Sequence, residues 1–261
     1  MRYQFSAQTD LGLTRKNNED SVVFDAATQT MILADGMGGY NAGEIASGMA
    51  TAFIKSELSR WLAEVGHSVG VAELRRAMQI CVDNANLSIF NAASSNAQYA
   101  GMGTTLVVGV FLGESLVLGH IGDSRCYRVR EGALEQITKD HSVLQEQIDA
   151  GLTTPAQAET SPIKNLLTRA LGVDAQVVLE VNEYAVLPGD LYMMCSDGLS
   201  DMVNNPAIAK ILLTETALEL VAQELITAAN AQGGRDNTSV LLAIAQEAAE
   251  KRGLIARLLR K

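Results

Sequence analysis

The sequence contains few cysteines and no arrangement of them that would bind zinc or form a disulfide framework. Only three occur among 261 residues, Cys81, Cys126 and Cys195, and none belongs to a C-x-x-C pair. An odd number at wide spacing excludes both kinds of site. We therefore expect the three side chains to be small, buried apolar groups in a protein of a reducing compartment.

Long hydrophobic runs are also missing. The first ten residues, MRYQFSAQTD, lack the basic region and the apolar stretch of a signal peptide. No run approaches the roughly 18 apolar residues that a membrane-spanning helix requires. From these two absences we expect a soluble, cytoplasmic protein, and we expect it to be a monomer.

Positive charge is scarce. Lys and Arg total 20 against 30 Asp and Glu, which gives a formal net charge of −10. Nucleic-acid surfaces depend on clustered Lys and Arg, so this balance argues against a nucleic-acid partner. The acidity suits a carboxylate-rich site for divalent cations, although solvated surface acids would produce the same balance.

Proline is rare as well, with four residues, and no repeat or Pro/Ser-rich linker divides the chain. We expect one compact domain over residues 1–246, followed by a basic tail over residues 247–261. The tail, EKRGLIARLLRK in its last twelve residues, is a short basic amphipathic pattern. It would contact a membrane surface or a partner, or simply be a solvated terminus; the solvated terminus is the more common outcome.

The apolar pattern predicts secondary structure in an order that excludes regular βαβ alternation. Two strands lie within residues 21–35, and helical periods cover residues 42–64, 71–93 and 216–230. Residues 104–138 are predicted to be successive strands, with turns at Gly113-Glu114 and Glu131-Gly132 that only antiparallel neighbours can use. Two strands around Pro188-Gly189 and a final strand, TSVLLAIA, complete an α+β fold of antiparallel sheets covered by helices.

The helical periods also predict which faces are buried. The stripe of residues 42–64 consists of Ile45, Met49, Ala52, Phe53, Leu58, Trp61 and Leu62, and that of residues 71–93 of Leu74, Met78, Cys81, Val82, Ala85 and Ile89.

The stretch MILADGMGGYNAG, residues 31–43, places an aspartate after an apolar run and before several glycines. Three interpretations are open: a loop that binds phosphate through backbone N–H groups, a metal-binding carboxylate with glycines for clearance, or a plain turn. The phosphate loop is the weakest of them, because the stretch fits neither G-x-x-x-x-G-K-[ST] nor G-x-G-x-x-G.

Four aspartates stand at predicted ends of apolar strands: Asp35, Asp123, Asp197 and Asp236. Each alone is most simply a turn or cap residue, but four in one domain favour a shared site. Converging carboxylates repel one another unless cations bridge them. Oxygen ligands without Cys or His suit Mg²⁺ or Mn²⁺. Asp35 would then bridge two ions, the Gly36 carbonyl would add a ligand, and the ions would activate a water for attack on phosphorus.

A substrate phosphate needs a cationic partner, and Arg15 in GLTRKNNEDS is the candidate. Guanidinium binds phosphate oxygens bidentately. Glu19 and Asp20 follow closely and would extend the acidic site directly or through water.

The chain as a whole resembles the PPM-type (type 2C) metal-dependent protein Ser/Thr phosphatases, in a compact bacterial form. The resemblance covers about residues 3–245. It rests on motifs that occur in the family's order: TRKNNEDS, ADGMGGYNAGEIAS, GMGTTL, GHIGDSRCYRV, TKDHS, TRALG, CSDGLSD and RDNTSVLLA.

The resemblance implies an α-β-β-α sandwich, two antiparallel sheets each flanked by a pair of helices. It implies that Asp35 bridges two metal ions, that the Gly36 carbonyl binds the first, and that Asp197 and Asp236 hold the second. Asp123 matches an acid that serves a third, weaker metal together with Asp197, and Arg15 matches the phosphate-binding arginine. Residues from about 142 to 175 match the flap beside the cleft, whose residues 153–162 have the most loop-like sequence.

One position departs from part of the family. Some members carry a histidine two residues after the bridging aspartate, where this chain has Met37, which cannot donate a proton. A water on a third metal, oriented by Asp123, is our candidate for the proton source. We expect His141, in TKDHS, to be structural.

The activity implied is hydrolysis of phosphoserine and phosphothreonine esters, with phosphoprotein substrates and a Ser/Thr kinase as natural opponent. The main alternative is a pseudophosphatase that keeps the fold without turnover, although every matched acid is present. A two-metal nuclease would need a basic groove that this acidic chain does not suggest.

Overall fold

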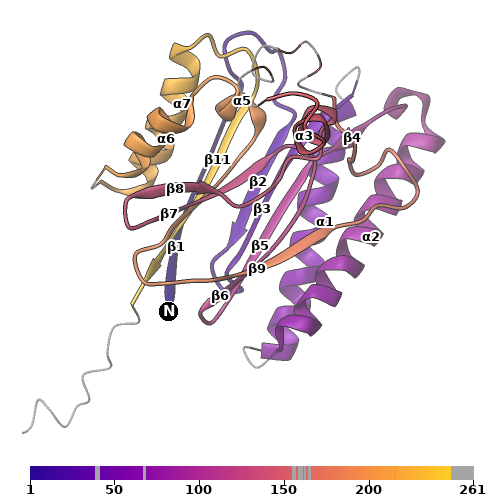
Figure 1. Cartoon of the computed structure of the whole chain (residues 1–261). Coiled ribbons are helices and arrows are strands. Elements are labelled where there is room, and N and C mark those ends of the chain that lie inside the picture. Colours follow the sequence, from indigo (N-terminus) through magenta and orange to yellow (C-terminus); the bar gives the residue numbers. More distant parts are fainter. Residues whose placement is uncertain are drawn as a thin grey trace, which may run out of the picture.

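The structure, a computed structural model of the chain, describes residues 1–38, 42–66, 69–154, 157, 161, 163, 166–214 and 216–247. Two antiparallel sheets lie face to face, and helices cover both outer faces (Figure 1). This is the expected α-β-β-α sandwich. The tail from residue 248 onward and most of residues 153–162 lie outside the described residues, so our expectations for them are not addressed.

The first sheet has the strand order β1-β11-β10-β7-β8. Its strands are β1 (Arg2–Asp10), β11 (Thr238–Gln246), β10 (Leu191–Cys195), β7 (Arg125–Arg130) and β8 (Ala133–Gln136).

The second sheet has the order β2-β3-β5-β6-β9, and β4 pairs with the end of β3. Its strands are β2 (Asp20–Asp25), β3 (Thr30–Met37), β5 (Leu106–Leu112), β6 (Ser115–Ile121), β9 (Glu180–Ala185) and β4 (Gly103–Thr104).

Two long helices cover the second sheet, and three shorter ones cover the first (Figure 1). The long pair is α1 (Ala42–Val65) and α2 (Val71–Ser95), followed by a 3₁₀ turn, η2 (Ala97–Tyr99); the others are α5 (Asp197–Ser200), α6 (Asn205–Leu212) and α7 (Leu218–Ala231). A further short helix, α3 (Val143–Asp149), lies in the expected flap region. Among the described residues no helix is long and apolar enough to cross a membrane.

Apolar side chains fill the space between the two sheets and beneath each helical layer. Between the sheets, Phe111 stacks on Tyr3 with a centroid separation of 4.0 Å and meets Tyr192 edge-on at 5.4 Å. Cys126 and Cys195 are buried on neighbouring strands and Cys81 on α2, all as free thiols. The expected burial of the cysteines is therefore confirmed.

The buried stripe of α2 is the expected one, whereas that of α1 is as expected only in its second half, at Leu58 and Leu62. Ala42, Ala46 and Ala50 face the sheet in the first half of α1, whereas Ile45 is 37% exposed. The pattern of large side chains was misleading there because small side chains allow the beginning of the helix to lie close against β3. Only from Ile54 onward do large residues take over the buried face.

Both predicted tight turns join antiparallel neighbours, β5 to β6 and β7 to β8. At the second turn Glu131 and Gly132 have φ of 51° and 79°, as a two-residue hairpin turn requires. The expectation that the successive strands of residues 104–138 are neighbours in one sheet is wrong, however. The chain passes from the second sheet to the first between β6 and β7, and again between β9 and β10.

Two kinds of element were not predicted. Strand β1 pairs with β11 over its whole length, from Arg2 opposite Gln246 to Asp10 opposite Thr238. The short helices α5, which follows β10 directly, and α6, which begins at Asn205, were not distinguished from loop. The end of β1 at Asp10 and the beginning of α5 lie at the same end of the sandwich.

Candidate functional site

Five aspartates meet at the end of the sandwich where the chain crosses between sheets. Asp20 and Asp35 are paired across β2 and β3. Asp123 lies in the crossover from β6 to β7, Asp197 is the first residue of α5, and Asp236 lies two residues before β11. This is the end at which α5 and β4 are labelled in Figure 1. The convergence expected for the four strand-end acids is present, and Asp20 joins them.

The carboxyl groups destabilise one another's charged forms. Burial raises the pKa of Asp35 well above its usual range, and the charges of Asp20, Asp197, Asp123 and Asp236 raise it further. The pKa of Asp197 is likewise raised, first by burial and then by Asp123 and Asp236. Residues brought together at this electrostatic cost are typical of a functional site.

Asp20 is held beside Asp35 but is not satisfied by the protein. Its Oδ2 accepts a hydrogen bond of 2.7 Å from the Ser196 hydroxyl. Its Oδ1 is buried and has no protein hydrogen-bond partner. Burial raises the pKa of Asp20 to about 6. A buried carboxylate oxygen without a donor is the kind of ligand atom that a hard cation would satisfy.

Asp123 stands slightly apart. Burial raises its pKa to about 6, and the largest charge contribution comes from Asp140, with a smaller one from Asp201. Arg125 lowers it, but this arginine is committed elsewhere: its guanidinium binds Asp140 through both Nε and Nη2. The Arg125 guanidinium is therefore paired with Asp140, while the charge of Asp123 acts on Asp197.

The acidic residues fit divalent cations by their chemistry. All the side chains offer oxygen, which Mg²⁺ and Mn²⁺ prefer. In the part of the chain that the structure describes, no three of these carboxylates bring their oxygens within 4.8 Å of one another.

Gly36 is required by packing, which is not the reason expected from the sequence. A Cβ on Gly36 would lie 2.1 Å from the Gly43 carbonyl oxygen and 2.6 Å from that of Glu19. Its N–H donates to the Glu19 carbonyl at 3.0 Å. The glycine thus allows the start of α1 and the segment before β2 to meet beside Asp35.

The interpretation of Asp35-Gly36 as a plain turn is wrong, since β3 continues to Met37.

Arg15 lies at the edge of the acids and pairs with one of them. Its Nη2 donates to Asp236 Oδ2 at 2.6 Å, with side-chain exposures of 48% and 30%. The hydrogen bond to Asp236 raises the pKa of Arg15, and Glu19 and Asp197 add to this. A half-exposed guanidinium in this position can turn from Asp236 to an incoming phosphate.

Glu19 contributes mainly through its backbone. Its carbonyl accepts from Gly36 N–H and from the Ser47 hydroxyl, the latter at 2.6 Å. Its own N–H donates to the Asn237 side chain at 2.8 Å. Burial raises the pKa of the Glu19 carboxyl. The residue therefore links β3, α1 and β11 beside the site.

Asn237 was missed by the sequence analysis, although it holds the site together. Its Nδ2 donates to the carbonyls of Leu11 and Asn17, at 3.0 and 2.9 Å, while its Oδ1 accepts from Glu19. It fixes the segment that carries Arg15 next to Asp236. The only signal was its place in RDNTSV, directly after a candidate acid.

The Met37 side chain lies against β4. Its terminal methyl carbon lies 2.8 Å from the position that a Cβ on Gly103 would occupy. The side chain packs over β4 and supplies no proton donor, as expected from its chemistry.

A second group of potential metal ligands lies near the site: His120, His141 and Glu180. The two rings stack at 4.6 Å, and His141 Nε2 lies 3.2 Å from Glu180 Oε2. However, the Gly122 N–H donates to His141 Nδ1 at 3.2 Å. A metal on Nε2 normally leaves a proton on the other ring nitrogen, and here a donor occupies that position. The group is therefore a hydrogen-bonded cluster, which agrees with a structural role for His141.

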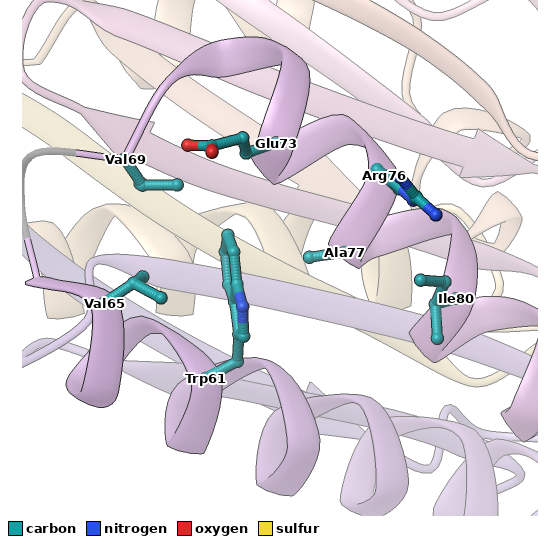
Figure 2. A pocket seen from close by; sticks show the side chains of 7 residues that line it. All are labelled: Trp61, Val65, Val69, Glu73, Arg76, Ala77 and Ile80. Carbon is teal, nitrogen blue, oxygen red and sulfur yellow. The ribbon is translucent and has the colours of Figure 1, made fainter.

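A groove of about 510 Å³ between α1 and α2 is separate from the acids. Figure 2 shows Trp61 and Val65 of α1 facing Ala77 and Ile80 of α2 across it. Helix α1 begins near the acids, and at 1.5 Å per residue Val65 lies roughly 35 Å farther along the helix. The groove therefore takes no part in the acidic site.

A family model described as protein phosphatase 2C matches residues 14–232. The chain belongs to the protein phosphatase 2C family. This 2C-family chain is 39% identical over 241 residues to the serine/threonine protein phosphatase PstP of Mycobacterium tuberculosis, covering 92% of this chain and 44% of PstP. It thus spans less than half the length of that relative.

Other relatives of this protein phosphatase 2C chain match nearly end to end. It is 35% identical over 238 residues to the serine/threonine phosphatase stp of Listeria innocua, covering 90% of this chain and 93% of stp. The crystal structure of the PstP catalytic domain in complex with two manganese ions superposes with a TM-score of 0.82 at 37% identity, covering 94% of this chain and 99% of that one. Both the family and the fold expected from the motifs are confirmed.

Proposed function

We propose that this chain is a metal-dependent protein phosphatase that hydrolyses phosphoserine and phosphothreonine esters. The observation that carries the proposal is the convergence of five aspartates beside a half-exposed arginine, on a fold shared with phosphatases such as PstP and stp. The unpartnered oxygen of Asp20 and the raised pKa values of Asp35 and Asp197 support cation binding at this place.

The ions are manganese or magnesium, with two at the main centre and a third held more weakly. The PstP structure with two manganese ions supports this choice. Asp35 would bridge the pair, the Gly36 carbonyl would bind the first ion, and Asp197 and Asp236 the second. Asp123, together with Asp197, would hold the third. When bound, such ions lower the pKa of a shared water and neutralise charge on the phosphate.

The chain's own residues bind and orient the ester. Arg15 leaves Asp236 to take two phosphate oxygens, which sets the phosphorus in line with the attacking oxygen. Asp123 is close enough to Asp197 to perturb its pKa, so it can orient a water that donates a proton to the leaving alkoxide. Met37 cannot do this, because it has no proton to give and faces β4.

The substrates would be phosphoproteins, and a Ser/Thr kinase or its targets would be the natural partner. The three free, buried cysteines suit a reducing compartment such as the cytoplasm.

Hydrolysis of p-nitrophenyl phosphate with Mn²⁺, with and without a chelator, tests the enzymatic claim. We expect Asp197→Asn to lower kcat/KM by about three orders of magnitude, or roughly 4 kcal/mol of transition-state stabilisation. Asp83→Asn, at an exposed position of α2, is the matched control and should retain full activity. Phosphoserine and phosphothreonine peptides should be cleaved and phosphotyrosine peptides spared. A metal-loaded protein that releases no phosphate, and that Asp197→Asn does not change, would be a pseudophosphatase.

A further inference from the structure

The turn that carries Asp123 is held by residues to which the proposed function gives no role. Gly122 has a φ of 99°, and a Cβ on it would lie 2.7 Å from Thr105 Cγ2. Thr105 therefore packs directly against the turn. It is 2% exposed and immediately precedes β5.

Thr105 holds both peptide groups of Asp35. The Asp35 N–H donates to Thr105 Oγ1 at 2.9 Å, and the Thr105 N–H donates to the Asp35 carbonyl, also at 2.9 Å. A backbone N–H is always the donor, so the Thr105 hydroxyl is the acceptor in the first of these bonds. Its own proton is then free to point to a second partner.

That partner is Ser124, the residue after Asp123. The two hydroxyl oxygens are 2.7 Å apart, and Ser124 is 1% exposed. Either hydroxyl can donate in this pair, since a hydroxyl oxygen that already accepts from Asp35 can still donate or accept a second hydrogen bond. A single buried hydroxyl thus connects the backbone of Asp35 with the turn of Asp123.

His141 holds the other side of the same turn. Its backbone N–H donates to the Gly122 carbonyl at 2.9 Å, and its Nδ1 accepts from the Gly122 N–H at 3.2 Å. Asp123 therefore lies between Gly122 and Ser124, two residues that are each fixed by buried partners.

We propose that Thr105 is a positioning residue that sets the separation of Asp35 and Asp123 through Ser124. The two carboxylates repel each other, since the charge of Asp123 raises the pKa of Asp35. A link between their backbones keeps them near enough to serve neighbouring ions. This inference rests on the proposed function, because Asp35 and Asp123 share a purpose only as metal-binding acids.

Three variants separate the parts of the link. Thr105→Val keeps the shape but removes the hydroxyl, so it loses both hydrogen bonds. Thr105→Ser keeps the hydroxyl. Ser124→Ala leaves the Asp35 N–H satisfied and removes only the connection to the Asp123 turn; it remains informative even where Thr105→Val fails to fold.

Binding of Mn²⁺, measured by isothermal titration calorimetry without substrate, is the test. Outer partners of metal ligands typically contribute about 10–100-fold to affinity, and we expect a loss in this range for Thr105→Val. Thr105→Ser should remain within about threefold of wild type. Ser124→Ala should weaken the low-affinity binding and leave the tight binding unchanged.

The decisive comparison uses Asp123→Asn as background. If Ser124 acts through Asp123, adding Ser124→Ala to Asp123→Asn should produce no further loss of Mn²⁺ affinity. A full additional loss in that background, or wild-type affinity in a folded Thr105→Val protein, would overturn the proposal. A wild-type protein that binds Mn²⁺ but hydrolyses no phosphate ester would instead refute the proposed function, and the binding data would still decide the role of Thr105.

Discussion

Arg15 is the residue whose side chain must change partners during the proposed reaction. Its contact with Asp236 is short but both side chains are partly exposed, and exposed pairs contribute little to stability. We expect Arg15→Ala to raise KM for a phosphothreonine peptide about tenfold or more, the equivalent of a charge-assisted hydrogen bond. The melting temperature should stay near that of wild type. Arg15→Lys should have a KM between those of wild type and Arg15→Ala, since lysine lacks the bidentate fork of the guanidinium. A KM that Arg15→Ala leaves unchanged would contradict this role for Arg15.

His141 is predicted to be neutral, with its proton on Nε2. Burial lowers the pKa of His141 below its usual 6.5, and nearby His120 and Arg169 lower it further, against an opposing effect of Glu180. Because the folded pKa is depressed, the stability that His141 contributes is present above the unfolded pKa and is lost as pH falls through the folded pKa.

Long-range ¹H–¹⁵N NMR of the imidazole tests this directly. At pH 6.5 we expect the Nε2-protonated tautomer, with Nδ1 free to accept from Gly122. His141→Asn, which keeps an acceptor near the Nδ1 position, should preserve the chemical shift of the Gly122 amide, and His141→Leu should not. A doubly protonated ring at pH 6.5, or a zinc ion bound at Nε2, would disprove the hydrogen-bonded assignment.

At the residue scale, sequence reasoning identified the acids and missed their supports. Asp35, Asp123 and Asp197 were visible because each follows an apolar run. Thr105 and Asn237 were not, because hydroxyl and amide side chains are common near turns, and their roles depend on partners that are distant in sequence, such as Glu19 for Asn237. Only the fold brings these groups together.

Among the elements, α2 holds residues 172–174, at the end of the expected flap, through the side chain of Asn86. Asn86 is 1% exposed; its Oδ1 accepts from Gly172 N–H at 2.8 Å and its Nδ2 donates to the Asp174 carbonyl at 2.9 Å. We expect Asn86→Ala to reduce the free energy of unfolding by about 1–3 kcal/mol, since buried backbone groups lose their partners. Urea unfolding would measure this.

Hydrogen exchange would locate the effect of Asn86→Ala. The increase in exchange rate over wild type should be largest for the amides of residues 166–179. Asn86→Asp keeps the acceptor and should protect the Gly172 amide. Asn84→Ala, exposed on the same helix, is the control. Uniformly faster exchange over the whole chain would mean that Asn86 stabilises the core and does not specifically anchor the flap.

Helices and hairpins that the apolar period and the turn residues define were predicted correctly. The assignment of strands to the two sheets was not. Helix α2 and the hairpins β5–β6 and β7–β8 followed from spacing and turn residues. The passage from β6 to β7 did not, because Gly122-Asp123-Ser124 is as short as a hairpin turn although it changes sheets. Local sequence specifies a reversal, but which strand pairs next depends on partners far along the chain, here β10 and β9.

For the whole molecule, the crowded acids make the metal-free protein sensitive to pH. Burial raises the pKa values of Asp20 and Asp123 from 3.8 to about 6, and those of Asp35 and Asp197 also rise. The folded state then holds more protons than the unfolded state between pH 4 and 6, so these groups lose their stabilising effect as pH rises through that window.

Asp35→Asn should therefore raise the melting temperature of the chelated protein, and by more at pH 7 than at pH 4. In Mn²⁺ wild type should have the higher melting temperature, because the ions stabilise only a folded state that can bind them. Differential scanning fluorimetry across this pH range, with chelator or Mn²⁺, measures both effects. An Asp35→Asn protein that is less stable than wild type in chelator at pH 7 would show that the carboxylate serves the fold rather than an ion.

The burial of all three thiols has a consequence for the molecule under oxidative stress. Burial raises the pKa of Cys81 to about 11 and of Cys195 to about 12, and that of Cys126 is also raised. Peroxide attacks the thiolate, and these thiols stay protonated inside the sandwich and have no role in the proposed hydrolysis. Dephosphorylation by this chain would thus continue under conditions that inactivate enzymes with a cysteine nucleophile.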